Sequence, residues 1–381
     1  MISRIIIIGG HIQALGLARQ AHHLGIEVVL FTTDNLSVAR WSNAVSHKIV
    51  GTLDTFINKT ISYRDGNTLI LPTGDDALEF LNTHREVLSN GFILGIPDRN
   101  TVNIFSDKKN TALFSQKNRI PHPVSFYPKS AEELIDMAAS MSYPIVLKPT
   151  VMHTFHRQFG KKAYLCKTPE ELIERAETIS KTYPVDQLII QEFLQGGPQN
   201  LFSYGVFAVN GVPIAWIIAN RIRQNPMDFG NSTTYAITCY IPEIEEIAKK
   251  ILSTTNYTGL AEIEFMYNSK NSRYEMLEVN TRAWKWHTLS ELLGFGFLDE
   301  MIRYHNKLPS LFTPKNRQVG WIDSITDIAV SLKEILHRRM SLKHWIKSYR
   351  ISKIHAAWAI SDPLPSIMYL LMSPILYFKR H

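Results

Sequence analysis

Three polar residues, Glu278, Asn280 and Arg282, occupy alternate positions in the segment EMLEVNTRAWKWH. In a β-strand, residues two apart point to the same face of the sheet, so these three would stand in one row. The earlier segment GLAEIEF spaces Glu262 and Glu264 in the same way. Carboxylates on neighbouring strands repel each other unless a positive group lies between them. Because Mg²⁺ prefers such oxygen ligands, the spacing predicts a magnesium site, with a solvated sheet face as the alternative.

Separated lysines form a second candidate site. Lys108 opens a predicted helix, and Lys148 closes the apolar segment YPIVLK just before a proline. Lys161 and Lys162 follow a glycine in an expected loop. A lone lysine is most often a solvated surface residue. Several lysines delivered to one place suit a polyphosphate instead, because each ammonium group acts as a point charge.

A third candidate is the segment IIQEFLQGG, in which an apolar strand runs into two glycines through Gln191, Glu192, Phe193 and Leu194. Extended backbone at this place can hydrogen-bond the edge of an adenine, with aromatic and aliphatic side chains as walls. The N-terminal turn GGHIQALG is different, because its glycines do not follow the G-x-G-x-x-G order of dinucleotide-binding proteins. We therefore expect a structural turn or a substrate contact there.

The aromatic residues after Arg282 have two interpretations. Trp284 and Trp286 either wall the site of an acceptor substrate or pack in the core. His287, which follows them, is a candidate general base.

The elements that position these residues follow a recognisable order. Residues 4–34 have the pattern of a βαβ unit, and strand and helix patterns continue to alternate to about residue 105, which predicts an open parallel sheet. From residue 106 the pattern is that of an α+β block. It includes one hairpin at Asn210-Gly211 and a second one between GLAEIEFMYN and RYEMLEVNTR. From about residue 306 the chain is basic and predicted to be helical.

Composition sets broad limits on the class of protein. The 381 residues carry a formal net charge of +7, which suits a phosphate-rich ligand or an anionic surface but is also common in globular proteins. The length predicts two or three domains. Cys166 and Cys239 are the only cysteines, which is typical of a reducing compartment and predicts a cytoplasmic protein.

Membrane segments are not expected. The N-terminal apolar run is too short for a signal peptide, and no apolar stretch has the length of a membrane span. The nearest is LPSIMYLLMSPILYF, which contains Pro374 and precedes Lys379 and Arg380. It predicts either a docked C-terminal helix or peripheral contact with a membrane surface. We expect no nucleic-acid binding, because the basic C-terminal region contains no recognition module.

Taken in chain order, these motifs resemble the ATP-grasp superfamily over about residues 1–305: Asp107-Lys108, YPIVLKP, GKKA, QEFLQGG, GLAEIEF and LEVNTR. The resemblance implies an α/β N-terminal parallel-sheet domain, residues 1–105, followed by an α+β ATP-grasp domain, residues 106–305. That domain would consist of two antiparallel-sheet subdomains, a small one at about 121–195 and a large one at about 196–305. A basic helical C-terminal extension, residues 306–381, would complete the chain; it looks like the corresponding segment of ATP-grasp proteins from bacterial surface-polysaccharide clusters.

The resemblance also implies roles for individual residues. ATP would be contacted by Lys108 and Lys148, by a loop with Lys161 and Lys162, and by an adenine hinge of Gln191, Glu192, Phe193 and Leu194. Magnesium, usually as two ions and with Mn²⁺ as the alternative, would be bound by Glu264, Glu278 and Asn280. Charge in the reaction would be stabilised by Arg282, Arg221 and Arg223. The chain departs from the family where relatives have a ribose-binding acid, because Gln199 and Asn200 stand there.

The implied activity is that of an ADP-forming ligase, which joins a small-molecule carboxylate to an amine through an acyl phosphate. Two alternatives stay open. One is a carboxylase-like or phosphotransferase enzyme of the same superfamily, and the other is a non-catalytic protein that binds a nucleotide or a membrane surface. A homodimer is compatible with each of them.

Overall fold

The computed structural model describes residues 1–150, 155, 158–160, 163–227 and 232–380. The chain forms two compact units. Unit 1 consists of Met1–Val102, Gly197–Glu264 and Val279–His381, and unit 2 consists of Asn103–Gly196 and Phe265–Glu278.

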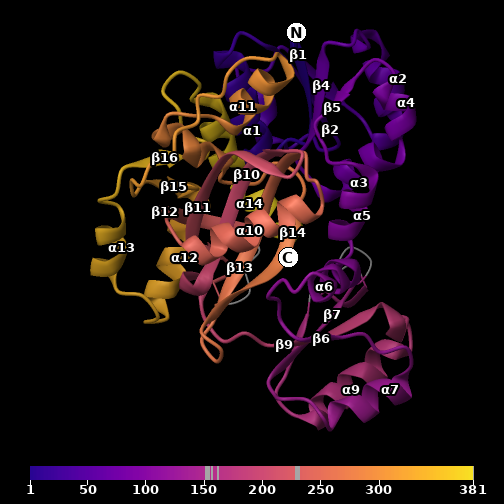
Figure 1. The fold of residues 1–381 in the computed structure, drawn as a ribbon. Helices are drawn as coiled ribbons and strands as arrows, with labels where there is room; N and C mark the ends of the chain where they lie inside the picture. The colour runs from indigo at the N-terminus through magenta and orange to yellow at the C-terminus, as the bar shows by residue number, and fades with distance from the viewer. Residues whose placement is uncertain (151–154, 156–157, 161–162, 228–231, 381) are drawn as a thin grey trace. The chain divides into compact units, whose positions relative to one another are not determined.

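The N-terminal part of unit 1 is a five-stranded parallel sheet (Figure 1). Its strands are β1 (Arg4–Ile8), β2 (Glu27–Thr32), β3 (His47–Val50), β4 (Thr68–Pro72) and β5 (Ile93–Leu94), in the order β3-β2-β1-β4-β5. The accompanying helices are α1 (Ile12–His23), α2 (Phe56–Thr60), α3 (Asp75–Thr83), α4 (Arg85–Ser89) and α5 (Arg99–Ser106). The prediction of an α/β parallel-sheet domain is confirmed.

Strand β1 is buried on both faces, as expected for a central parallel strand. Ile5 and Ile7 belong to one hydrophobic core, while Ile6 and Ile8 belong to another on the opposite side of the sheet. The isoleucine run of the sequence therefore fills two cores at once, because successive side chains alternate between the faces.

The glycines of the first turn serve close packing. A Cβ on Gly10 would lie 2.1 Å from the Ser37 Oγ, and one on Gly16 would lie 2.7 Å from the His287 Nε2. Neither neighbour leaves room for a methyl group. This packing agrees with the interpretation of the segment as a structural turn.

A seven-stranded sheet has the order β14-β13-β10-β11-β12-β15-β16. The strands are β10 (Leu201–Val209), β11 (Val212–Asn225), β12 (Ser232–Cys239), β13 (Gly259–Asn268), β14 (Arg273–Asn280), β15 (Gly320–Ile322) and β16 (Lys353–His355). Helices α10 (Pro242–Thr254) and α11 (Phe297–His305) accompany it. Strands β10 and β11 form the predicted hairpin, and Asn210 and Gly211 turn it with φ of 49° and 78°. Positive φ at both turn residues explains the Asn-Gly pair.

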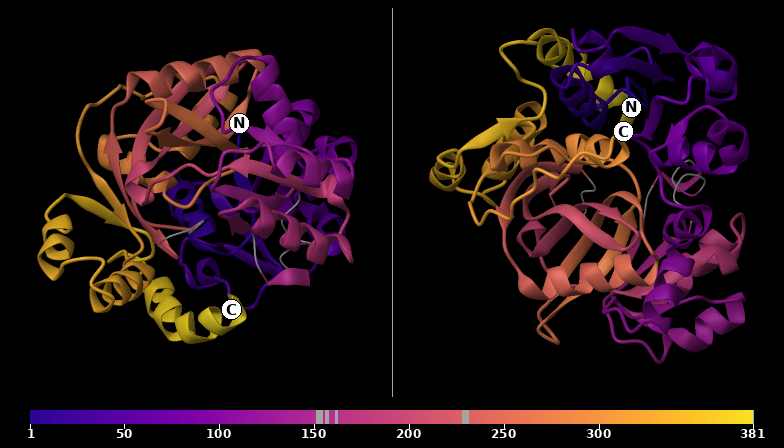
Figure 2. Two further views of the ribbon diagram at one scale, coloured as in Figure 1. Left: turned by 90° about the horizontal axis from the view of Figure 1, so that it is seen from below. Right: turned by 45° about the horizontal axis from the view of Figure 1, so that its top comes forward.

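The C-terminal extension contains the predicted helices, and it also contributes two short strands that the sequence did not indicate. Helices α12 (Ser324–Leu336), α13 (Leu342–Ser348) and α14 (Leu364–Arg380) alternate with β15 and β16, which extend the large sheet beyond β12. Figure 2 shows α14, in yellow, alongside the indigo N-terminal domain of the same unit. There Arg19 pairs with Asp362 at 3.0 Å. Among the described residues, no helix combines the length and apolar content that a bilayer-spanning segment needs.

Unit 2 contains a four-stranded antiparallel sheet of order β6-β9-β7-β8. Its elements are α6 (Lys108–Lys117), β6 (Ser125–Phe126), α7 (Ala131–Ala138), β7 (Ile145–Pro149), β8 (Tyr164–Cys166), α9 (Pro169–Ser180) and β9 (Leu188–Glu192). Helices α7 and α9 contact each other, and Leu134 and Leu172 share a core with Leu147 of β7. Together with the antiparallel strands β10 to β12 of the large sheet, this sheet confirms the prediction of two antiparallel sheets.

Candidate active site

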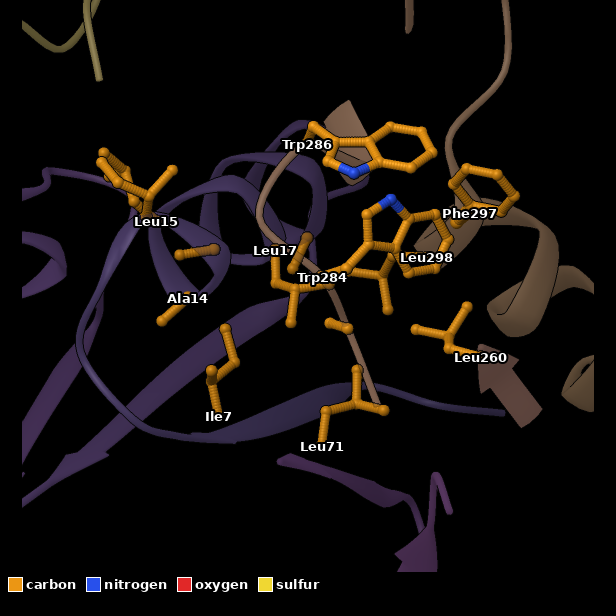
Figure 3. Close-up of a cluster of buried hydrophobic side chains, with 14 of the residues drawn as sticks. Ile7, Ala14, Leu15, Leu17, Leu71, Leu260, Trp284, Trp286, Phe297 and Leu298 are labelled. Carbon is orange, nitrogen blue, oxygen red and sulfur yellow. The ribbon is translucent and has the colours of Figure 1, made fainter. Parts of the chain in front are cut away.

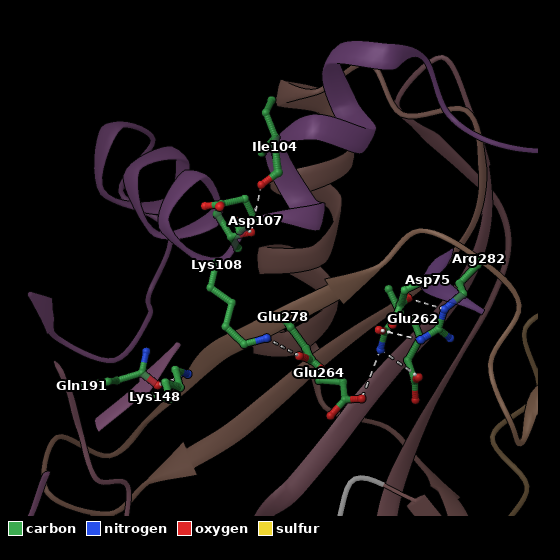
Figure 4. A network of polar contacts seen from close by, with 12 residues as sticks. Asp75, Ile104, Asp107, Lys108, Lys148, Gln191, Glu262, Glu264, Glu278 and Arg282 are labelled. Atoms are coloured by element: carbon green, nitrogen blue, oxygen red, sulfur yellow. Dashed lines mark hydrogen bonds and ion pairs between the residues drawn. The ribbon is translucent and has the colours of Figure 1, made fainter. Parts of the chain in front are cut away.

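The polar row of β14 continues in unit 1 as a hydrogen-bonded group (Figure 4). The Asn280 side-chain amide donates to Glu262 at 3.3 Å and to Glu264 at 3.2 Å. Arg221 of β11 pairs with Glu264 at 2.9 Å, and both side chains are largely buried. The repulsion expected between neighbouring carboxylates is thus relieved by an amide and a guanidinium group.

The two glutamates of β13 differ in their surroundings. Glu262 is buried, and one of its oxygens accepts a 2.8 Å hydrogen bond from the Trp286 indole. Burial raises the pKa of Glu262, and the positive charge of Arg221 opposes this shift. Glu264 is less enclosed, so it is the carboxylate that can offer an oxygen to an ion. Glu262 instead holds the Asn280 amide and Trp286 in place.

The described part of the chain contains no cluster of three His, Cys, Asp or Glu side chains able to hold a metal ion alone. The carboxylate of Glu264 and the amide of Asn280 nevertheless supply hard oxygen ligands. Such a set fits Mg²⁺, which takes most of its ligands from water and phosphate oxygens and few from the protein.

Arg282, just beyond β14, holds a carboxylate of the N-terminal domain. Its Nε donates to Asp75 Oδ1 at 2.6 Å, and Asp75 is the first residue of α3. The Arg282 side chain is 15% exposed, whereas that of Asp75 is 62% exposed. A largely buried guanidinium group therefore presents its donors to an exposed carboxylate, which is the geometry that an anionic substrate needs.

In unit 2, strand alternation separates a core face from a polar face. Leu147 and Ile190 lie in the core, so Lys148 and Gln191 project from the opposite face of the sheet. The Lys148 Nζ donates a 2.7 Å hydrogen bond to the Gln191 side-chain oxygen. The predicted phosphate-contacting lysine and the first predicted hinge residue thus lie side by side.

Both residues line one pocket with Lys108, and β14 completes its wall with Met276 and Leu277. The Lys108 Nζ also lies 3.8 Å from the Glu278 Oε2. Burial lowers the pKa of Lys148 to about 7, with a further contribution from the charge of Lys108. The pocket therefore combines an apolar wall with two cationic groups.

The predicted hinge is extended backbone at the end of β9. The Glu192 N–H donates to Val124 at 2.8 Å, and the Phe193 N–H donates to Pro144 at 3.3 Å. Within the described residues, the Leu194 N–H has no hydrogen-bond acceptor. The Leu194 N–H is therefore the donor in the predicted hinge that could hydrogen-bond an acceptor atom on the edge of an adenine. Lys161 and Lys162, predicted to close over the phosphates, lie outside the described residues.

The structure does not support a catalytic role for Arg223. Its side chain is 2% exposed and pairs with Asp327 of α12 at 2.7 Å and 2.9 Å. It also lies over the Tyr235 ring and donates to Ser348. Its three side-chain nitrogens thus serve to attach the C-terminal extension to β11.

The two tryptophans pack in the core, and this resolves the alternative that the sequence left open (Figure 3). Trp284 packs against Phe297 with ring centroids 4.8 Å apart. His287 is buried as well, and burial lowers its pKa to about 4. Its Nε2 lies 3.2 Å from the Gln13 carbonyl oxygen. These three aromatic side chains are core residues beneath the polar row, so we do not propose any of them as a substrate contact or as the general base.

Sequence reasoning missed three residues of the site. Met276 and Leu277 were visible as the apolar residues that precede Glu278 on the same strand, although nothing in the pattern assigned them to a pocket. Asp75 could not be found, because it lies 207 positions from Arg282 in the chain.

Comparison with known families agrees with this geometry. Residues 107–306 match the family model described as carbamoyl-phosphate synthase L chain, ATP binding domain, which covers more than half of the chain. The chain belongs to the ATP-grasp superfamily. The predictions of an ATP-grasp fold and of an ATP-binding enzyme of the ligase class are thereby confirmed.

Among curated relatives of this ATP-grasp protein is the D-aspartate ligase of Enterococcus faecium. It is 21% identical over 299 residues, which cover 73% of this chain and 70% of the relative. A carbamoyl phosphate synthase large chain section of Methanopyrus kandleri is 24% identical over 49% of this chain, and the match spans only 34% of that protein.

Solved structures show the same fold. The N5-carboxyaminoimidazole synthetase of Staphylococcus aureus, complexed with ADP, matches with a TM-score of 0.68 at 15% identity, covering 88% of this chain and 86% of that one. The biotin carboxylase domain dimer of Hydrogenobacter thermophilus 2-oxoglutarate carboxylase, in complex with MgADP, ADP and bicarbonate, matches with a TM-score of 0.65 at 17% identity, covering 83% and 72%.

Proposed function

We propose that this ATP-grasp protein is an ADP-forming ligase that joins a small-molecule carboxylate to an amine. The D-aspartate ligase, which aligns over most of both chains, supports a carboxylate–amine reaction. The observation that carries the proposal is the position of Arg282, which holds an exposed carboxylate beside the Asn280–Glu264 pair.

ATP would be bound by the pocket residues of unit 2. Lys108 and Lys148 would neutralise phosphate oxygens, and the Leu194 amide would hydrogen-bond the adenine edge. Met276 and Leu277 would form the apolar wall beside the base. Glu264, Glu278 and Asn280 are the proposed ligands of Mg²⁺, which when bound would neutralise charge on the phosphates.

The carboxylate substrate would take the place of Asp75 on Arg282. One of its oxygens would attack the γ-phosphorus, the bond to the bridging oxygen would break, and ADP would leave. The amine nitrogen would then attack the acyl carbon, phosphate would leave, and the amine would lose a proton as the amide forms. Arg282 and Arg221 would stabilise the anionic groups during these steps, because the protein contributes mainly positioning and charge stabilisation.

The test is a coupled assay of ADP release with Mg²⁺-ATP and a panel of amino acids, other carboxylates and amines. An ¹⁸O-labelled carboxylate should transfer one label to the released phosphate, since its oxygen bridges the acyl phosphate. Replacement Arg282→Lys should lower kcat/KM on the order of a hundredfold, because a lysine cannot form the paired hydrogen bonds of a guanidinium group.

A second candidate is a carboxylase-type reaction, in which bicarbonate is the acid that becomes phosphorylated. The fold similarity to the carboxylases and synthetases above favours it. ADP release that requires bicarbonate, without any amide product from the carboxylate panel, would identify this reaction. Failure to release ADP in both panels, despite measurable ATP binding, would exclude the two enzymatic proposals together.

A further inference from the structure

The C-terminal extension has an unusually apolar surface. Residues 306–375 carry more exposed large hydrophobic side chains than the remainder of the described chain together. They are Leu308, Leu311, Ile328, Leu332, Leu336, Leu342, Ile346, Trp358, Ile360, Leu364, Ile367, Leu370, Leu371 and Ile375. Scattered exposed hydrophobic residues need no explanation, but a concentration in one segment indicates an interaction surface.

Helix α14 is apolar on two opposite sides. Tyr369 and Met372 are buried in the core of unit 1. Leu364, Ile367 and Leu371 follow helical spacing on another side and are exposed, with Leu371 at 64%. A helix that is apolar on both sides normally has both of them covered. The outer stripe of α14 is therefore exposed apolar surface of the kind that a binding partner covers.

Helix α12, which contacts α14, also has an exposed apolar stripe, although its buried side is mostly polar. Ile328, Leu332 and Leu336 are spaced four residues apart and are all exposed, with Leu336 at 81%. In the left view of Figure 2 the helices of the extension follow one another along one margin of unit 1. The exposed apolar residues thus belong to neighbouring helices of one segment.

The charges of the extension have only one sign at the surface. Its acidic residues are Asp323, Asp327, Glu334 and Asp362, and all four are buried. Each of them pairs with a cation: Lys285, Arg223, Arg339 and Arg19, respectively. The loop after α12, helix α13 and the segment that follows it carry the exposed cations Arg338, Lys343, Lys347 and Arg350. The surface therefore shows positive charge and apolar groups without an exposed acid.

We propose that the C-terminal extension docks this protein on the surface of an anionic lipid bilayer. The outer stripe of α14 enters the boundary between headgroups and acyl chains, and the cations around α13 contact acidic headgroups. This combination of an apolar helix face with flanking lysines and arginines is what interfacial binding requires. The docking is peripheral, since the described helices are too short or too polar to cross the bilayer.

A lipid surface fits these residues better than a protein partner does. A protein partner would need an apolar groove with an acidic rim. The shape of that groove would have to match α12, α13, α14 and the segments between them. An anionic bilayer offers an apolar layer beneath a continuous negative surface, so it complements both features without a specific shape. The proposal does not depend on the activity proposed above.

The experiment is co-sedimentation of the full chain with vesicles of phosphatidylglycerol and phosphatidylcholine, compared with vesicles of phosphatidylcholine alone. We expect binding to the anionic vesicles that weakens as salt is added. The double variant Leu364→Ser/Leu371→Ser should lose on the order of a hundredfold in partitioning, because two apolar side chains of the outer stripe leave the acyl boundary. The double variant Lys343→Gln/Lys347→Gln should lose about fivefold for each charge.

A matched control is the double variant Ile61→Ser/Val87→Ser, whose residues are 58% and 52% exposed in the N-terminal domain. It should bind vesicles like the wild type. Thermal unfolding of every variant checks that the fold is retained. If the leucine variant unfolds, the lysine variant still tests the proposal independently. Absence of binding by the wild type would overturn the proposal. A second result would also overturn it: a wild-type dimer in sedimentation equilibrium that the leucine replacements dissociate, with no binding to vesicles. The outer stripe of α14 would then join two copies of the chain.

Discussion

The Arg282 guanidinium group, beyond the end of β14, donates to the Asp75 carboxylate at 2.6 Å, in the first turn of α3. The two residues come from different parts of unit 1, and only the aspartate is largely exposed. A pair of this kind contributes little to stability, because water competes for the exposed partner. The aspartate can therefore be exchanged for another carboxylate at low cost.

Replacement Asp75→Asn should lower the KM for the carboxylate substrate by about two- to fivefold, with kcat little changed. The reason is that removing an exposed competitor recovers about 0.2–1 kcal/mol of binding free energy. Steady-state kinetics at saturating ATP measure the effect. Asp76→Asn is the matched control, because Asp76 is the neighbouring exposed acid of α3. A higher KM for the Asp75 variant would instead mean that Asp75 positions Arg282.

ATP binding should be accompanied by proton uptake near and above neutral pH. Burial lowers the pKa of Lys148 to about 7, so the free protein loses this positive charge as the pH rises through 7. Phosphate oxygens favour the charged form, so binding restores the proton and ATP affinity should fall above pH 7 by up to about tenfold per unit. Calorimetry at pH 8 in two buffers of different ionisation enthalpy measures the uptake. Lys148→Arg should abolish this uptake, because arginine stays charged.

Replacement Gly16→Ala should destabilise the fold without changing the chemistry of the ATP pocket. The added Cβ would lie 2.7 Å from both His287 Nε2 and Thr288 Cγ2, inside a packed core. Overpacking of this kind costs about 1–3 kcal/mol in the free energy of unfolding, which urea denaturation measures. Gly296→Ala is the control, since its Cβ would meet its nearest neighbour at 3.5 Å. Equal stability of the two variants would contradict the packing argument.

Replacement Asp327→Ala should cost about 3–5 kcal/mol in the free energy of unfolding, because it leaves the Arg223 charge buried without its partner. The double variant Arg223→Met/Asp327→Leu should recover most of this loss, since no charge then remains buried. Urea denaturation of the single and double variants provides the comparison. If Arg223 were catalytic, the double variant would regain stability but would remain inactive in the ADP-release assay.

Local sequence patterns were sufficient to predict much of the secondary structure of this molecule. The isoleucine run of β1, the Asn210-Gly211 turn and the alternate spacing of Glu278, Asn280 and Arg282 each depend on neighbours in the chain. Periodicity and turn chemistry therefore predicted the parallel sheet, the hairpins and the polar row of β14. The motif order was enough to indicate the ATP-grasp fold.

Local sequence thus specifies the set of elements and the row of chemical groups that each one carries. The tertiary structure decided which groups remain available to a ligand. Arg223 and Arg221 stand two apart on β11, yet only Arg223 is committed to an acid of the C-terminal extension. The tryptophans after Arg282 became core residues, and Lys148 acquired a lowered pKa through burial. Burial and long-range pairing depend on residues far apart in the chain, so no local pattern could have assigned them.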